Sequence, residues 1–246
     1  MGTVLFPKFA LMARATDRDE LRDLATRAMR MALFIGLPIA CTLFALRASL
    51  VELLFCHGAF SEIAARRVGL LFGLSLMGMP ARVVFFYQVR IFYALEDTAW
   101  PAYVTSLSTL FALVVMPAAG EQFGAPGIAA SYAVIAWIGV AVQGYVLRLK
   151  YNACHNRRLL FFALRISVPA VSAAWLGVKA GQTIEVLVEA ATLAVAVKIS
   201  SGMIVTMFLY WLMARAAQIP EAQEIRRYIR WQSASAVNAA KAGICG

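Results

Sequence analysis

The chain has 246 residues, of which 62% are hydrophobic and only 15% are charged. Soluble domains average roughly 45–50% apolar and about 25% charged residues, so a soluble core of this size could not bury so much apolar surface. The formal net charge of +10 would suit a nucleic-acid-binding protein, but its distribution along the chain argues against a nucleic-acid partner.

Six apolar runs have the length of a membrane-crossing helix. A hydrocarbon core about 30 Å thick needs roughly 20 apolar residues at a rise of about 1.5 Å each. None of the runs alternates with period two, which argues against an outer-membrane barrel. We therefore expect an all-α integral membrane protein with six transmembrane helices, at about residues 28–46, 68–89, 102–118, 127–147, 160–180 and 188–213.

The positive side chains collect in alternate loops between these runs. If the stretch before the first run is cytoplasmic, most of the 23 Lys and Arg residues fall on the cytoplasmic side. The exceptions are four residues outside and two within the runs: Arg47, Arg66, Arg67 and Lys179, then Arg82 and Lys198. The positive-inside rule thus predicts that both termini are cytoplasmic, and that the basic loops meet anionic lipid headgroups rather than nucleic acid.

Glycine and proline interrupt the first two runs. Gly36 precedes Pro38 in the first, and Gly78 precedes Pro80 in the second. Proline removes a helical hydrogen bond and kinks the helix, while a nearby glycine permits close packing. Bent helices border the pathway in transporters, but they also occur in inert bundles, so both interpretations stay open.

The loop after the second run has two acidic residues and a proline. Pro101 is expected to lie in the first turn of the third helix. Glu96 and Asp97 could bind protons or cations, but their place before a helix start favours capping of its free N–H groups. Small residues then follow from Gly127 to Ser131, where we expect tight contact between helices.

Motifs for catalysis or metal binding are absent from the sequence. The four cysteines are scattered, and the two histidines, His57 and His155, fall on opposite sides of the membrane. These positions offer no disulfide framework and no metal-ligand spacing. We therefore predict no enzyme activity, no metal and no cofactor.

Arg82 is the strongest candidate for a functional residue. It lies near the middle of the second run, where a charge costs roughly 2.5–3.5 kcal/mol on insertion scales. One interpretation is a cavity residue that attracts a phosphate-bearing substrate. The other is a structural arginine bonded to helix carbonyls. For Lys198, in the sixth run, snorkelling or polar packing is favoured.

Several stretches together resemble the MurJ (MviN) family of lipid II flippases. Residues 92–101 resemble the family's Phe-Tyr-Ala-Leu-Gln-Asp-Thr-x-x-Pro signature, and residues 4–8 resemble the motif that closes its eighth span. Further similar stretches are residues 54–60, 78–80 and 127–131. The positions carrying the resemblance are Gly58, Phe60, Pro80, Phe92, Tyr93, Asp97, Thr98, Pro101 and Gly127.

The resemblance implies a transporter of the multidrug/oligosaccharidyl-lipid/polysaccharide exporter superfamily, in the bacterial cytoplasmic membrane. Such a protein moves undecaprenyl-pyrophosphate-linked peptidoglycan precursor from the inner to the outer leaflet by alternating access. Family members have fourteen spans in two lobes with a cationic central cavity. The chain resembles spans nine to fourteen, so we expect a partial bundle that lacks the first lobe and is inactive without it.

The same resemblance implies a division of the chain and a role for Arg82. Many members carry lysine where this chain has Phe86, and Arg82 lies one turn earlier on the same helical face, so we expect Arg82 to replace that cation. A separately encoded first lobe, a membrane scaffold and an exporter of another lipid-linked glycan all remain open. The expected parts are a cytoplasmic amphipathic lead-in (1–30), four helices of the second lobe (28–147), a basic cytoplasmic loop (148–159), two helices forming a lipid-tail groove (160–213) and a cytoplasmic tail (214–246).

Overall fold

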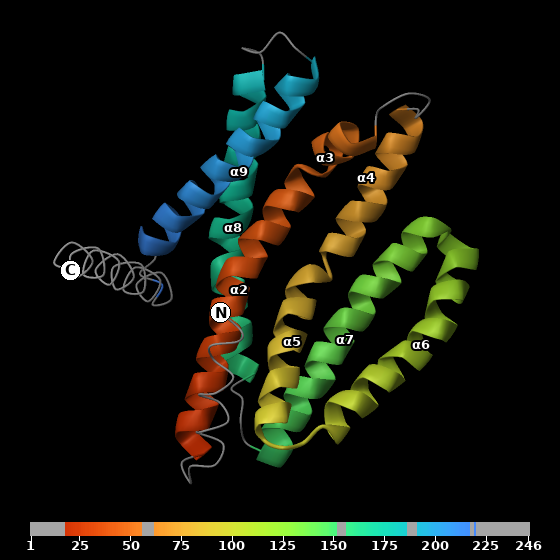
Figure 1. Ribbon diagram of the computed structural model, residues 1–246, viewed down its shortest axis with the longest axis vertical. Coiled ribbons are helices and arrows are strands. Elements are labelled where there is room, and N and C mark those ends of the chain that lie inside the picture. Colours follow the sequence, from red (N-terminus) through yellow and green to blue (C-terminus); the bar gives the residue numbers. More distant parts are fainter. Residues whose placement is uncertain (1–17, 56–61, 152–155, 186–190, 217–218, 220–246) are drawn as a thin grey trace, which may run out of the picture.

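The computed structural model describes residues 18–55, 62–151, 156–185, 191–216 and 219 (Figure 1). These residues form helices joined by short connections, which confirms the all-α prediction. In chain order the helices are α2 (Arg18–Ala45), α3 (Arg47–Phe55), α4 (Glu62–Leu76), α5 (Met79–Ala94), α6 (Ala99–Phe123), α7 (Ala125–Tyr151), α8 (Asn156–Glu185) and α9 (Ala191–Ala216).

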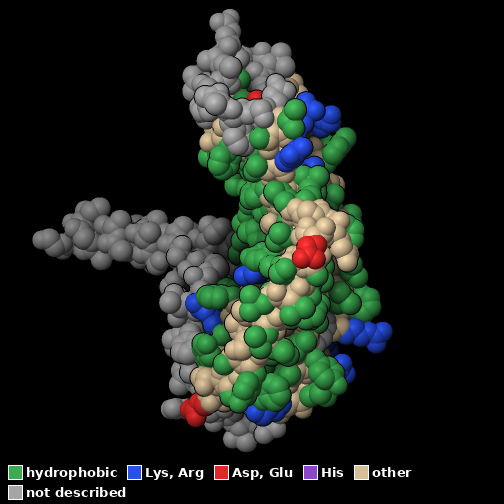
Figure 2. Space-filling model, turned by 90° about the vertical axis from the view of Figure 1, so that its right-hand side faces the viewer, with side chains coloured by type: hydrophobic (Ala, Val, Ile, Leu, Met, Phe, Trp, Pro, Cys, Tyr) green, Lys and Arg blue, Asp and Glu red, His purple; other side chains and the backbone are tan. Residues whose placement is uncertain are grey.

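Six helical segments of the described chain are long and apolar enough to cross a membrane, as the sequence predicted. They are Arg22–Ala45, Ile63–Ala94, Ala99–Phe123, Ala125–Tyr151, Arg157–Ile184 and Ala194–Ala216. The second combines α4 and α5. Apolar side chains cover much of the flank in Figure 2, as expected for a surface that meets lipid tails.

The core lies where α2, α5, α7 and α8 meet. Its fully buried side chains include Met29, Ile91, Leu147 and Ile166, one from each of these helices. The hydroxyl of Tyr210 on α9 donates to the carbonyl of Phe34 on α2 at 3.0 Å. In contrast, α6 contacts mainly α7 and leaves most of its surface outside the bundle (Figure 1).

Helices α8 and α9 approach each other at glycines. A Cβ atom at Gly177 would lie 2.0 Å from Oγ1 of Thr206, and one at Gly181 would lie 2.7 Å from the carbonyl oxygen of Lys198. Gly202 faces them from α9, with its own Cβ position 3.2 Å from the oxygen of Gly177. Gly177 and Gly181 have the G-x-x-x-G spacing that lets membrane helices pack at their backbones.

The second span breaks instead of merely kinking. The helix ends at Leu76 and restarts at Met79, with Pro80 in the first turn of α5. The carbonyl of Met77, freed by the break, accepts a hydrogen bond of 3.0 Å from Nε1 of Trp137 on α7. Pro38, in contrast, stays within the continuous helix α2.

Several sequence predictions fall outside the described residues. Gly58 and Phe60, the first 17 residues, the middle of the basic loop and nearly all of the tail belong to this group. Gly127, however, makes the close contact expected of it. A Cβ there would lie 2.3 Å from the carbonyl oxygen of Ala119 on α6.

We expect Gly177→Leu to separate α8 from α9, because the added side chain has no room beside Thr206. Overpacking of this kind costs roughly 1–3 kcal/mol, so the melting temperature of the purified chain in detergent should fall clearly. Lys179→Leu is the matched control, since Lys179 is exposed between the two glycines. Equal melting temperatures for the two variants would contradict the close packing.

Candidate functional site

The break in the second span brings Arg82 to the face of α7. A Cβ at Gly78 would lie 3.0 Å from Cα of Ala133, so α5 begins almost in backbone contact with α7. Arg82 follows one turn later, and its guanidinium carbon lies 4.1 Å from the ring centroid of Tyr132. At this distance the cation is stabilised by the face of the ring.

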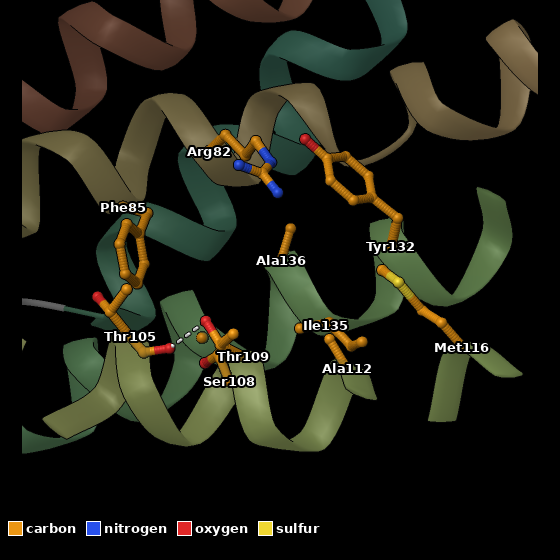
Figure 3. A pocket seen from close by; sticks show the side chains of 11 residues that line it. Arg82, Phe85, Thr105, Ser108, Thr109, Ala112, Met116, Tyr132, Ile135 and Ala136 are labelled. Atoms are coloured by element: carbon orange, nitrogen blue, oxygen red, sulfur yellow. Dashed lines mark hydrogen bonds between the residues drawn. The ribbon is translucent and has the colours of Figure 1, made fainter. Parts of the chain in front are cut away.

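Arg82 lines a cavity between α5, α6 and α7. The cavity has a volume of about 280 Å³, and Figure 3 shows the guanidinium directed into it across from Tyr132. Of the described residues that line the cavity, Arg82 alone carries a charge. The lining consists of Arg82, Phe85, Thr105, Ser108, Thr109, Ala112, Met116, Tyr132, Ile135, Ala136 and Gly139.

Hydroxyl groups of α6 form the wall opposite Arg82. Oγ1 of Thr105 donates to the carbonyl of Pro101 at 2.7 Å, and Oγ1 of Thr109 donates to the carbonyl of Thr105 at 3.0 Å (Figure 3). These bonds use the hydroxyl hydrogens and leave oxygen lone pairs as acceptors. The cavity therefore offers a cation on one side and hydrogen-bond acceptors on the other.

Phe86 does not line this cavity. Its side chain is 53% exposed, and the guanidinium carbon of Arg90 lies 4.3 Å from its ring centroid. Arg82, Phe86 and Arg90 follow one another at a spacing of one helical turn, so they share a face of α5. Phe86, which stands where many family members carry lysine, therefore has an arginine one turn to either side of it.

A second polar cluster ties the loop after α5 to the end of α7. Nζ of Lys150 donates to Oδ2 of Asp97 at 2.8 Å, and the hydroxyl of Tyr151 donates to the same oxygen. The other carboxylate oxygen accepts a hydrogen bond of 3.4 Å from the backbone N–H of Trp100. The capping interaction predicted for Asp97 is therefore present, but the hydrogen bonds to α7 accompany it. The bonds from Lys150 and then Tyr151 lower the pKa of Asp97 to about 2.

Among the other signature residues, Phe92 packs against this cluster. Phe92 is fully buried, with its ring centroid 6.1 Å from that of Tyr151. Pro101 lies in the first turn of α6, as predicted, and Thr98 precedes the helix as its N-cap residue. Tyr93 is 47% exposed. The partners on α7 were not predictable from the spacing, because they follow Asp97 by more than fifty residues.

Comparison with known proteins gives the family. The profile described as "Lipid II flippase MurJ" matches residues 1–186. The chain belongs to the MurJ family. A flippase moves a lipid without making or breaking covalent bonds, so membership also agrees with the prediction that the chain is not an enzyme. The family and the six apolar helices identify a multi-pass protein of the inner membrane.

Relatives within the MurJ family are much longer than the part that this chain matches. A "Probable lipid II flippase MurJ" of Rhizobium meliloti (strain 1021) is 30% identical over 138 residues, which are 56% of this chain and 26% of the relative. One of Rhizobium tropici is 29% identical over 150 residues, 59% of this chain and 27% of the relative. One of Buchnera aphidicola subsp. Schizaphis graminum (strain Sg) is 24% identical over 170 residues, 68% of this chain and 33% of the relative.

A solved structure has the same fold. The structure titled "Lipid II flippase MurJ, inward closed conformation" superimposes with a TM-score of 0.66 at 17% sequence identity, covering 87% of this chain and 42% of that chain. The chain thus spans less than half the length of this MurJ structure, and about a third or less of the curated relatives.

We expect Asp97→Asn to loosen the loop between α5 and α6, because a neutral amide loses the attraction to Lys150. Hydrogen–deuterium exchange at residues 95–98 should become several-fold faster. Since Lys150 is about half exposed (48%), solvent screens the pair and global stability should fall only slightly. Glu121→Gln, at the far end of α6, is the control.

The lowered pKa of Asp97 also predicts the pH dependence of this loop. A carboxylate with a depressed folded-state pKa contributes stability above its ordinary value of 3.8, and this contribution is lost as the pH falls through about 2. After correction for intrinsic rates, hydrogen–deuterium exchange at residues 95–98 should therefore not become faster anywhere between about pH 5 and 8. Faster exchange within that range would contradict the lowered pKa of Asp97.

Proposed function

We propose that this chain supplies part of a lipid II flippase and that Arg82 contacts the pyrophosphate of the lipid-linked peptidoglycan precursor. The observation that carries the proposal is a single charged side chain in a cavity within the apolar spans. A guanidinium offers a planar set of donors that suits phosphate oxygens. Stacking on Tyr132 fixes one face of the guanidinium and leaves its N–H edges for a ligand.

The lipid tail of the precursor is proposed to run along α8 and α9, within residues 160–213. Large apolar side chains of α8 face outward here, including Leu164, Val168, Val171 and Trp175, which are 58–69% exposed. A polyprenyl chain is apolar and could lie against this surface in place of bilayer lipids. Both termini are proposed to be cytoplasmic, because most Lys and Arg residues then lie inside.

Transport is proposed to require a second lobe. The cavity of about 280 Å³ is only partly enclosed by the described helices, and alternating access needs one bundle to move against another. The relatives are long enough to contain such a lobe besides the part that this chain matches. The second lobe of this protein would be either part of the same polypeptide or a separate chain. Without it, we expect no precursor export.

A membrane scaffold is the second candidate function. It is favoured by α6, whose large apolar residues are mostly exposed: Tyr103, Leu107, Leu110, Leu113 and Val114 are each 60–71% accessible. Such a face could pack against helices of another protein. A scaffold would need no cation in its cavity, which is the point at which the two candidates differ.

We expect Arg82→Ala to lower export of a labelled precursor roughly tenfold or more, in vesicles that hold this chain with a second flippase lobe. Loss of a charge-assisted hydrogen bond costs about 1.5–3 kcal/mol, which corresponds to this factor. Arg82→Lys should retain part of the activity.

Photocrosslinking separates the two candidate functions. A photoactivatable precursor should crosslink to the cavity residues and to residues 160–213 in a flippase, whereas a scaffold should crosslink only to protein. Unchanged export in Arg82→Ala, together with the absence of precursor crosslinks, would contradict the proposed function.

A further inference from the structure

Two cavities meet at Arg47, at the end of the bundle opposite the Asp97 cluster. An apolar cavity of about 370 Å³ lies between α2, the α4–α5 break and α8, and its walls include Leu37, Phe44, Pro80 and Trp175. A second cavity of about 610 Å³ lies between α3 and α4, with the charged residues Glu52 and Arg66 in its wall. Arg47 lines both cavities.

Three contacts hold Arg47 at this junction. Its Nη1 donates to the carbonyl of Phe44 at 2.8 Å, and its guanidinium carbon lies 4.5 Å from the Phe44 ring centroid. Its aliphatic stem lies over Gly73 of α4, where a Cβ would be 2.8 Å from Cδ of Arg47. Several N–H groups of the guanidinium are left for a ligand, because an arginine has more donors than this one bond uses.

The position of Arg47 shows which of the two cavities lies nearer the membrane surface. The first span ends at Ala45, so Arg47 lies at the membrane surface, and the apolar cavity extends from there toward the break in the second span. A cavity with charged residues at the surface could hold the headgroup of a lipid, and the apolar cavity beneath it could hold an acyl chain of the same lipid. With both termini in the cytoplasm, as proposed above, this surface lies outside the cell.

We propose that these cavities bind an anionic phospholipid of the outer leaflet, with its phosphate on Arg47 and an acyl chain in the apolar cavity. Both volumes lie within the range of about 300–1,000 Å³ that is usual for ligand sites. Arg47 lines both cavities, and its single positive charge matches the single negative charge of a phosphodiester. The site is separate from the Arg82 cavity, although Trp175 in its wall also belongs to the α8 surface proposed for the precursor's tail.

Native mass spectrometry of the purified full chain tests this site. The chain is titrated with phosphatidylglycerol and with phosphatidylcholine of the same acyl chains, and the bound lipid is counted. We expect preferential retention of phosphatidylglycerol. Arg47→Gln should lower that retention roughly tenfold, since a charge-assisted hydrogen bond is lost, and Arg47→Lys should keep part of it.

Two further variants separate the site from general surface charge and from misfolding. Arg67→Gln should bind as the wild type does, because Arg67 is exposed on α4 and lines neither cavity. Cys41→Phe should lower retention of both lipids by filling the apolar cavity that Cys41 lines. Circular dichroism and melting temperature identify the folded variants.

Three results would overturn the proposal. The first is equal retention of the two lipids by the wild type. The second is an equal loss in Arg47→Gln and Arg67→Gln. The third is complete displacement of phosphatidylglycerol by an equal concentration of undecaprenyl pyrophosphate, which would assign the site to the precursor instead.

Discussion

Close backbone contact between helices is the interaction on which the rest of this structure depends. Inside a bilayer the hydrophobic effect gives little reason for one apolar helix to leave lipid for another, so helices associate where small residues allow their backbones to meet. Gly127 joins α6 to α7 in this way, Gly177 joins α8 to α9, and Gly78 brings the start of α5 to α7. The contact at Gly78 also fixes Arg82 opposite Tyr132.

Features set by local sequence were predictable. Hydropathy predicts six spans, proline chemistry places Pro101 in the first turn of α6, and small-residue packing predicts the contact at Gly127. The break before α5 was expected only as a kink, because its stabilising bond from Trp137 joins residues sixty positions apart. The contact between Tyr132 and Arg82 was not predicted for the same reason, since these residues are also far apart in the sequence. The G-x-x-x-G spacing of α8, in contrast, is visible in the sequence and could have predicted the contact with α9.

In the Arg82 and Arg47 sites, an aromatic ring stabilises the arginine next to apolar helices. Arg82 stacks on Tyr132, and Arg47 stacks on Phe44. In both cases the ring stabilises one face of the guanidinium, while its N–H edge can still reach an anion. One cavity lies within the spans and the other opens at the surface, which suits a headgroup in transit and a resident lipid, respectively.

If Arg82 binds a phosphate, polar ligands must be able to enter the space between α5, α6 and α7. Thiol accessibility tests this entry, in a chain whose four natural cysteines are replaced by alanine. Thr109→Cys places a thiol in the cavity wall, and Val114→Cys places one on the exposed face of α6, further along the same helix. A small charged thiol reagent applied to membranes should label the cysteine at position 109 and spare that at 114. Equal labelling of both, or labelling at 114 alone, would contradict the account.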